Sequence, residues 1–120
     1  MDLRIFQKDD HKIIWGDAIE VLENEIEDAS IDLIFIDPPY NIGEKYAEST
    51  DKWESVETYL IWCYQWLDLC ISKLKKSGTM YVMTATQHMP YFDIYLSDRI
   101  KILSRIFWHY DSASVQARRY

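Results

Sequence analysis

The tetrapeptide Asp37-Pro38-Pro39-Tyr40 brings together three groups that can bind a planar base carrying an amino group. The carboxylate of Asp37 can accept two hydrogen bonds. The two prolines fix φ and remove two backbone N–H donors, which leaves nearby carbonyls as acceptors. Tyr40 offers a flat ring on which a base can stack. An exocyclic amine requires hydrogen-bond acceptors, and the base that carries it requires an aromatic ring to stack on. The tetrapeptide supplies both and therefore predicts a base-binding site. The alternative is a turn that ends a strand, since Asp and Pro both favour turns.

The segment before this tetrapeptide, Ile31–Ile36, is almost continuously apolar. Such a run predicts a strand that is buried on both faces at the centre of a parallel sheet. Two prolines cannot donate to a β-ladder, so the strand must end at Asp37. Ligands of open α/β sheets bind beyond the carboxyl ends of the strands, and the tetrapeptide lies at such an end.

Apolar periodicity predicts an α/β domain around this strand, and 120 residues suit one domain. Asp17, followed by Glu20, favours a helix start at Ala18. Apolar residues at spacings of four and three predict a long helix over Glu54–Leu74, with Gly78 as its C-cap. The other expected elements are strands at His11–Trp15, Thr79–Thr84 and Ile102–Tyr110, a helix at Pro90–Leu96, and a polar, loose N-terminal lead over residues 1–11. This order predicts a doubly wound, mostly parallel sheet.

The formal charge of −7 argues against non-specific binding to nucleic acid. The charge is unevenly divided, because residues 1–60 carry −11 and residues 61–120 carry +4. The basic residues near the C-terminus are Arg99, Lys101, Arg105, Arg118 and Arg119. This part of the chain can therefore bind a polyanion locally. The alternative is an ordinary solvated surface of mixed charge.

The two cysteines, Cys63 and Cys70, lie seven residues apart in the pattern of the long helix, so both are expected in the core. This spacing is neither a redox pair nor a metal-binding framework, and it fits a reducing cytoplasm. The first residues contain no apolar leader, and no run reaches membrane-spanning length. We therefore expect a cytoplasmic protein that contacts no membrane and holds no metal.

The chain resembles the N-terminal part of a site-specific DNA methyltransferase of the permuted, beta group, in which the Asp-Pro-Pro-Tyr motif comes first. The segments that carry the resemblance are IIWGDAIEVL, IDLIFIDPPYNIG, KLKKSGTMYV and RIFWHYDSASVQARRY. Asp37, rather than Ser or Asn, at the first motif position favours adenine N6 over cytosine N4. The likeness is greatest to solitary adenine methyltransferases that act at a short palindrome such as ATGCAT. Whether a restriction enzyme accompanies the protein stays open.

The resemblance implies a Rossmann-like methyltransferase fold and a flipped target adenine in double-stranded DNA. Tyr40 would stack on the base, and Asp37 and the Pro38 carbonyl would accept hydrogen bonds from N6, with Pro39 completing the motif. S-adenosylmethionine would supply the methyl group, with Asp37 nearby and Asp17 bonded to its adenine. For Asp17, the helix N-cap is the alternative role.

Further candidates for DNA contacts are Asn41, which follows the motif and would help to shape the pocket, and Arg118 and Arg119, which would contact the phosphate backbone. For Asn41 the alternative is a turn residue that only shapes the loop. For the two arginines the alternative is a frayed basic terminus. Residues 12–110 are expected to form the catalytic-motif half of the domain, and residues 111–120 the truncated start of the target-recognition region.

The family also needs a Gly-rich loop, D-P-F-x-G-x-G, for the methionine end of the cofactor. The only glycines are Gly16, Gly43 and Gly78, and none lies in such a context. We therefore expect a sheet that is incomplete at its cofactor-binding half, an unpartnered strand at His11–Trp15, and little activity without a complementary C-terminal fragment. The other functions considered are a non-catalytic module that binds nucleic acid or a partner, an N4-cytosine methyltransferase, and an RNA amino-methyltransferase.

Overall fold

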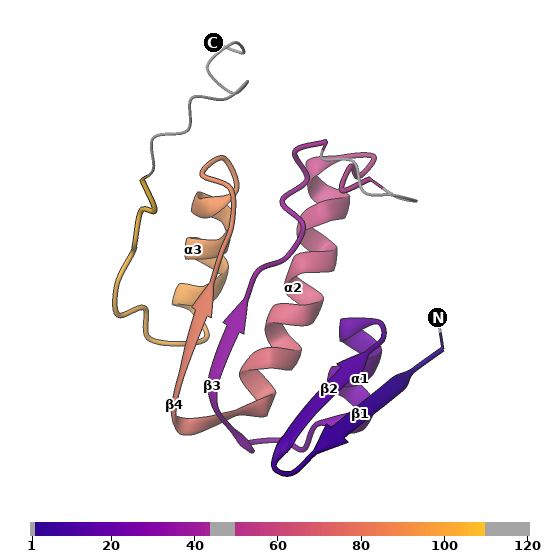
Figure 1. Ribbon diagram of the computed structural model, residues 1–120. Coiled ribbons are helices and arrows are strands. Elements are labelled where there is room, and N and C mark those ends of the chain that lie inside the picture. Colours follow the sequence, from indigo (N-terminus) through magenta and orange to yellow (C-terminus); the bar gives the residue numbers. More distant parts are fainter. Residues whose placement is uncertain (1, 44–49, 110–120) are drawn as a thin grey trace.

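The computed structural model describes residues 2–43 and 50–109, so Arg118, Arg119 and the predicted recognition segment at 111–120 lie outside the described residues. The described part is a mixed α/β structure (Figure 1). Its elements are β1 (Arg4–Lys8), β2 (His11–Trp15), α1 (Ala18–Glu25), β3 (Ile31–Ile36), α2 (Val56–Lys73), β4 (Leu74–Val82) and α3 (Met89–Ser97). No helix within these ranges is long and apolar enough to cross a membrane.

The strands form two separate pairs rather than one mostly parallel sheet within the described ranges. Strands β3 and β4 are parallel, and Leu33 lies opposite Thr79. Strands β1 and β2 are antiparallel, and Arg4 lies opposite Trp15. The parallel strand Ile31–Ile36 has the bounds predicted from its apolar run.

The N-terminal lead is not loose, because Arg4–Lys8 forms strand β1 and gives His11–Trp15 the partner that it was expected to lack. The two strands are joined through Asp9 and Asp10, and Asp9 has φ 53°. Aspartate tolerates this left-handed conformation better than most residues, because its short side chain can bond locally. Two aspartates between segments of β character were the sequence signal for a hairpin that the prediction missed.

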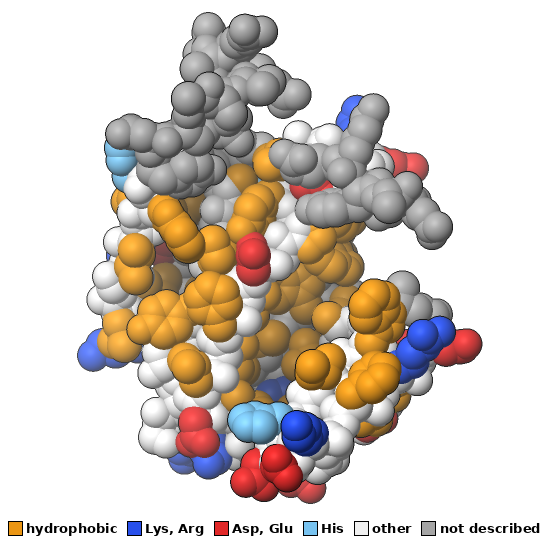
Figure 2. All heavy atoms as spheres, in the orientation of Figure 1, with side chains coloured by type: hydrophobic (Ala, Val, Ile, Leu, Met, Phe, Trp, Pro, Cys, Tyr) orange, Lys and Arg blue, Asp and Glu red, His pale blue; other side chains and the backbone are white. Residues whose placement is uncertain are grey.

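One face of the β3–β4 pair is covered by helices, and the other is open. Ile34 and Met80 point into the core beneath α2 and α3, as do their neighbours Ile36 and Val82. On the opposite face the exposed fractions are 60% for Leu33 and 63% for Phe35. Figure 2 shows hydrophobic side chains gathered over β3 and β4 on this face. A doubly wound fold carries helices on both faces, so that prediction is not met by the part of the chain described.

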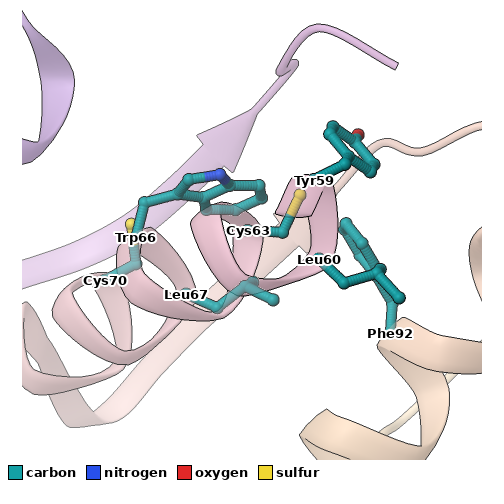
Figure 3. Close-up of a cluster of buried hydrophobic side chains, with 7 residues drawn as sticks. All are labelled: Tyr59, Leu60, Cys63, Trp66, Leu67, Cys70 and Phe92. Atoms are coloured by element: carbon teal, nitrogen blue, oxygen red, sulfur yellow. The ribbon is translucent and has the colours of Figure 1, made fainter. Parts of the chain in front are cut away.

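Helix α2 supplies most of the core. Its N-cap Ser55 accepts a hydrogen bond from the backbone N–H of Thr58, and Lys73 in the last turn suits the helix dipole. The buried cluster in Figure 3 consists of Tyr59, Leu60, Cys63, Trp66, Leu67 and Cys70 from α2, with Phe92 from α3. Both cysteines are free and buried, as predicted, and burial raises the pKa of each thiol to about 11.

The prediction that Gly78 caps this helix is wrong, since α2 ends at Lys73 and β4 begins at the next residue. The carbonyls of the last turn accept hydrogen bonds from the segment before β3: Ala29 N–H bonds the Ser72 carbonyl at 3.0 Å, and Ser30 N–H bonds the Lys73 carbonyl at 2.9 Å. The ammonium of Lys73 also bonds Asp28 at 2.7 Å. These bonds satisfy the helix end, so no glycine cap is needed.

Gly78 instead lies within β4, where the pairing with β3 shifts register. A Cβ atom at this position would lie 2.6 Å from Cδ1 of Leu74 and 3.0 Å from the carbonyl oxygen of Ile31. A side chain here would crowd the Leu74 side chain and the Ile31 carbonyl, which favours glycine at this position.

The strand predicted at Ile102–Tyr110 is also absent, because residues 101–109 have no regular secondary structure and Tyr110 lies outside the described residues. Arg105 holds this segment against α3 through two hydrogen bonds to Asp93, at 2.5 and 2.7 Å. The aromatic residues that suggested a strand are exposed: Phe107 at 72% and Trp108 at 74%.

Replacing Gly78 by alanine should lower the free energy of unfolding by about 1–3 kcal/mol, because the new methyl group overpacks against Leu74 and Ile31. Urea unfolding followed by circular dichroism measures this change. The neighbouring Ser77→Ala, at an exposed position of β4, is the matched control and should stay within about 0.5 kcal/mol of the parent. Equal stability of the two variants would contradict the close-approach explanation.

Candidate functional site

The Asp37–Tyr40 loop leaves the carboxyl end of β3. Pairing continues to this end, since the N–H of Met83 bonds the Ile36 carbonyl at 2.9 Å. Asp37 is exposed, Pro38 is buried, and Pro39 and Tyr40 are half-buried. The prolines are therefore packed against the protein, while the carboxylate is open to solvent at the edge where a ligand of a parallel sheet binds.

Within this loop, the structure brings together the two side chains assigned to base binding. The hydroxyl of Tyr40 donates a hydrogen bond to Oδ1 of Asp37. This bond fixes the ring beside the carboxylate, so a base stacked on Tyr40 would present its edge to Asp37. The loop can therefore offer an aromatic face and an acceptor at the same place.

The residues after the tetrapeptide anchor the loop to the segment before α2. Asn41 has φ 56°, a conformation that asparagine adopts more readily than most residues. Its Oδ1 accepts a hydrogen bond from the N–H of Trp53 at 2.9 Å. The N–H of Ile42 bonds Oδ2 of Asp51 at 3.3 Å, and Asp51 is buried. Asn41 thus has the loop-shaping role of the alternative reading, and its assignment to DNA stays a prediction.

Tyr59 is a residue of the site that the sequence did not reveal. Its hydroxyl donates a hydrogen bond to the Pro39 carbonyl at 2.7 Å, and its side chain is fully buried. Burial raises its pKa well above the usual range, assisted by the neighbouring Cys63, so the hydroxyl keeps its proton. The spacing of four residues to Cys63 places Tyr59 on the buried face, but spacing alone carries no signal for the bond to Pro39.

His88 is a second residue missed from the sequence. It lies at the N-cap of α3, is 2% exposed, and its ring centroid is 4.9 Å from that of Tyr59. Neither ring nitrogen has a hydrogen-bond partner of good geometry among the described residues. Burial lowers the pKa of His88, opposed by a backbone group of Tyr40. The imidazole is therefore neutral at neutral pH.

Three tryptophans pack around or near Tyr59, which holds the loop. The ring centroids of Trp53 and Tyr59 lie 4.9 Å apart, those of Trp53 and Trp62 lie 5.0 Å apart, and those of Trp62 and Trp66 lie 5.9 Å apart. All three tryptophans contact or join the buried cluster.

Asp17 is the N-cap of α1, as one of its two predicted roles required. Its Oδ1 accepts hydrogen bonds from the N–H groups of Ile19 at 3.0 Å and Glu20 at 3.1 Å. Among the described residues, no hydrogen bond joins Asp17 to the Asp37–Tyr40 loop. The role of Asp17 at a cofactor therefore stays a prediction.

Comparison with known families identifies the family to which the Asp37–Tyr40 segment belongs. The family model N6_N4_Mtase, described as DNA methylase, matches residues 31–120, a range that contains the whole Asp37–Tyr40 loop. The chain belongs to this DNA methylase family. The resemblance seen in the sequence is thus confirmed.

Individual relatives agree with this assignment. The chain is 41% identical over 90% of its length to the DNA adenine methyltransferase YhdJ of Escherichia coli, and 34% identical over 92% to the type II methyltransferase M.HpaI of Haemophilus parainfluenzae. It is 33% identical over 79% to the type II methyltransferase M.BamHI of Bacillus amyloliquefaciens. It spans only 36%, 35% and 22% of the lengths of these three relatives.

The buried imidazole of His88 should make the fold sensitive to acid. Its pKa is lowered in the folded state from an ordinary value near 6.5, so the unfolded chain binds a proton that the folded chain resists. This contribution to stability is complete above about pH 6.5 and is lost as the pH falls, by at most about 1.4 kcal/mol per pH unit. Urea midpoints measured between about pH 8 and pH 5 test this dependence.

His88→Asn should flatten the pH dependence, because an amide takes up no proton in this range. The control is His11→Asn at an exposed position of β2. If the two variants follow the same pH profile, His88 is not the group responsible.

Proposed function

We propose that this chain supplies the base-binding and catalytic loop for methyl transfer from S-adenosylmethionine to adenine N6 in DNA. The observation that carries the proposal is the Asp37–Tyr40 pair at the end of a parallel strand. The solvent-exposed carboxylate of Asp37 accepts a hydrogen bond from the hydroxyl of Tyr40. The pair lies inside the range matched by the DNA methylase family.

Each motif residue has a defined part in this proposal. The target base must leave the duplex, because its amino group is out of reach within the stack. Tyr40 stacks on the extruded ring, and the Asp37 carboxylate and the Pro38 carbonyl accept hydrogen bonds from the amino group. These bonds hold the amino nitrogen in place and increase its electron density. The loop thus contributes mainly positioning to an in-line transfer.

Adenine is the proposed base for two reasons. The first motif residue is Asp37 rather than Ser or Asn, and the E. coli relative at 41% identity is named a DNA adenine methyltransferase. The matching family covers N6 and N4 methylation alike, so transfer to cytosine N4 is the second candidate. The product of the reaction distinguishes these two functions.

The described residues can meet part of what the binding of S-adenosylmethionine, the methyl donor, requires. S-adenosylmethionine supplies an electrophilic methyl group when bound. Asp17 is exposed, and only Oδ1 takes part in the helix cap, so Oδ2 can accept a hydrogen bond from the donor's adenosine. For the methionine end we propose a Gly-rich loop on a complementary C-terminal polypeptide, which would complete a Rossmann-like sheet. The E. coli relative, of which this chain spans 36%, has room for such a segment.

The proposal is tested by incubating duplex DNA with methyl-labelled S-adenosylmethionine and identifying the modified nucleoside by mass spectrometry. The chain is assayed alone and together with the C-terminal part of the E. coli relative. We expect N6-methyladenine from the combined preparation, and its loss in Asp37→Ala. N4-methylcytosine as the product would overturn the choice of base, and an unchanged yield in Asp37→Ala would overturn the assigned site.

Two substitutions of Tyr40 should separate the roles of its ring and its hydroxyl. Tyr40→Phe keeps the stacking face and frees Asp37 from the hydroxyl that bonds it, so activity should stay within about tenfold of the parent. Tyr40→Ala removes a stacking contact of about 1–3 kcal/mol, so kcat/KM should fall by about 10- to 100-fold. Equal losses in both variants, measured as initial rates of methyl transfer, would show that the hydroxyl rather than the ring matters.

A further inference from the structure

We propose that Tyr59 is a positioning residue, which sets the direction of the catalytic loop through the carbonyl of Pro39. The proposal rests on the proposed function only for its effect on catalysis. The geometric part, that a hydroxyl on α2 determines where Tyr40 lies, stands on the contacts of the described residues alone.

The bond itself is short, and its donor side chain is buried. The Tyr59 hydroxyl lies 2.7 Å from the Pro39 oxygen, and the tyrosine side chain is 0% exposed. Since Tyr59 is buried and Pro39 is half-buried, breaking the bond leaves the tyrosine hydroxyl without its protein partner and costs free energy. The bond therefore holds one orientation of the Pro39 peptide.

Fixing the Pro39 carbonyl also fixes the position of Tyr40. The proline rings lock φ at Pro38 and Pro39, so ψ is the main rotation left at each residue. The carbonyl oxygen of Pro39 and the amide nitrogen of Tyr40 belong to one planar peptide group and turn together about ψ of Pro39. A bond from Tyr59 that stops this rotation therefore sets the direction in which the chain enters Tyr40.

The same bond distinguishes the two carbonyls of the motif. The Pro39 carbonyl is occupied by Tyr59, whereas no donor from the described residues bonds the Pro38 carbonyl. The Pro38 carbonyl therefore has no competing protein donor among the described residues for the role proposed above.

Tyr59 can act as a fixed reference because its own ring is enclosed. The centroids of Trp53 and His88 each lie 4.9 Å from its ring, and that of Trp62 lies 6.1 Å away. Trp53 also donates its backbone N–H to Asn41, so one aromatic cluster holds the loop on both sides of Tyr40. Rigid packing of this kind transmits position accurately to the loop.

Tyr59→Phe tests the proposal, because it removes the hydroxyl and keeps the packed ring. Tyr95→Phe is the matched control: it removes a hydroxyl that bonds Asp68 at 2.8 Å, away from the loop. Hydrogen–deuterium exchange of the full chain, read by NMR, reports on the amides of Ile42 and Trp53, which bond Asp51 and Asn41.

In Tyr59→Phe, we expect these two amides to exchange about fivefold faster, while amides in the middle of α2 keep their rates. Tyr95→Phe should leave the rates of both loop amides unchanged. Acceleration spread evenly through α2 would show a merely structural role and overturn the proposal. Unchanged exchange of both loop amides would overturn it as well.

In the preparation active in the methyl-transfer assay, Tyr59→Phe should lower kcat about tenfold with the KM for S-adenosylmethionine unchanged. A rise in this KM at constant kcat would contradict a positioning role. If the parent transfers no methyl group, the proposed function fails, and the exchange measurement still decides whether Tyr59 orders the loop.

Discussion

The burial of one face of α2 is the interaction on which the rest of the structure depends. The helix packs on the inner face of β3 and β4 through Ile34 and Met80, and it meets Phe92 of α3 and Leu22 of α1. A two-stranded pair is marginally stable in water without a packing partner. The apolar contacts of this helix therefore hold the parallel strands together and keep their carboxyl ends in place.

The Asp37–Tyr40 loop is attached to the same helix and to the segment just before it. Its polar attachments come from Asp51, Trp53 and Tyr59, and the rings of the last two belong to or pack on the core cluster. Hydrophobic packing and loop geometry are thus joined in the same residues: the rings contribute burial, while the Tyr59 hydroxyl and the backbone N–H of Trp53 orient the loop. Asp37 itself takes no part in this packing and stays open to solvent.

Features determined by neighbouring residues were predictable from the sequence. The strand Ile31–Ile36 and the Asp17 cap follow from local apolar runs and helix-start chemistry, and the DNA methylase family follows from a specific tetrapeptide. The Tyr59 bond was not predictable, because it joins residues 20 apart and a tyrosine at core spacing shows only that it is buried. Gly78 was misassigned because a glycine after a helix suggests a cap, whereas it lies within β4, where a Cβ atom would crowd Leu74 and the distant Ile31 carbonyl.

The direct passage from α2 into β4 determines an order of events in folding. Ile31 pairs with Leu74, so β3 meets its partner across the loop and the whole of α2. Such a non-local contact forms slowly, because the intervening chain must first be ordered, whereas a hairpin such as β1–β2 closes within about 1–10 μs. The helix shortens the path between the two strands once it has formed. We therefore expect collapse of α2 onto β3 to bring Leu74 into register, and the edge that carries Asp37 to form after this step.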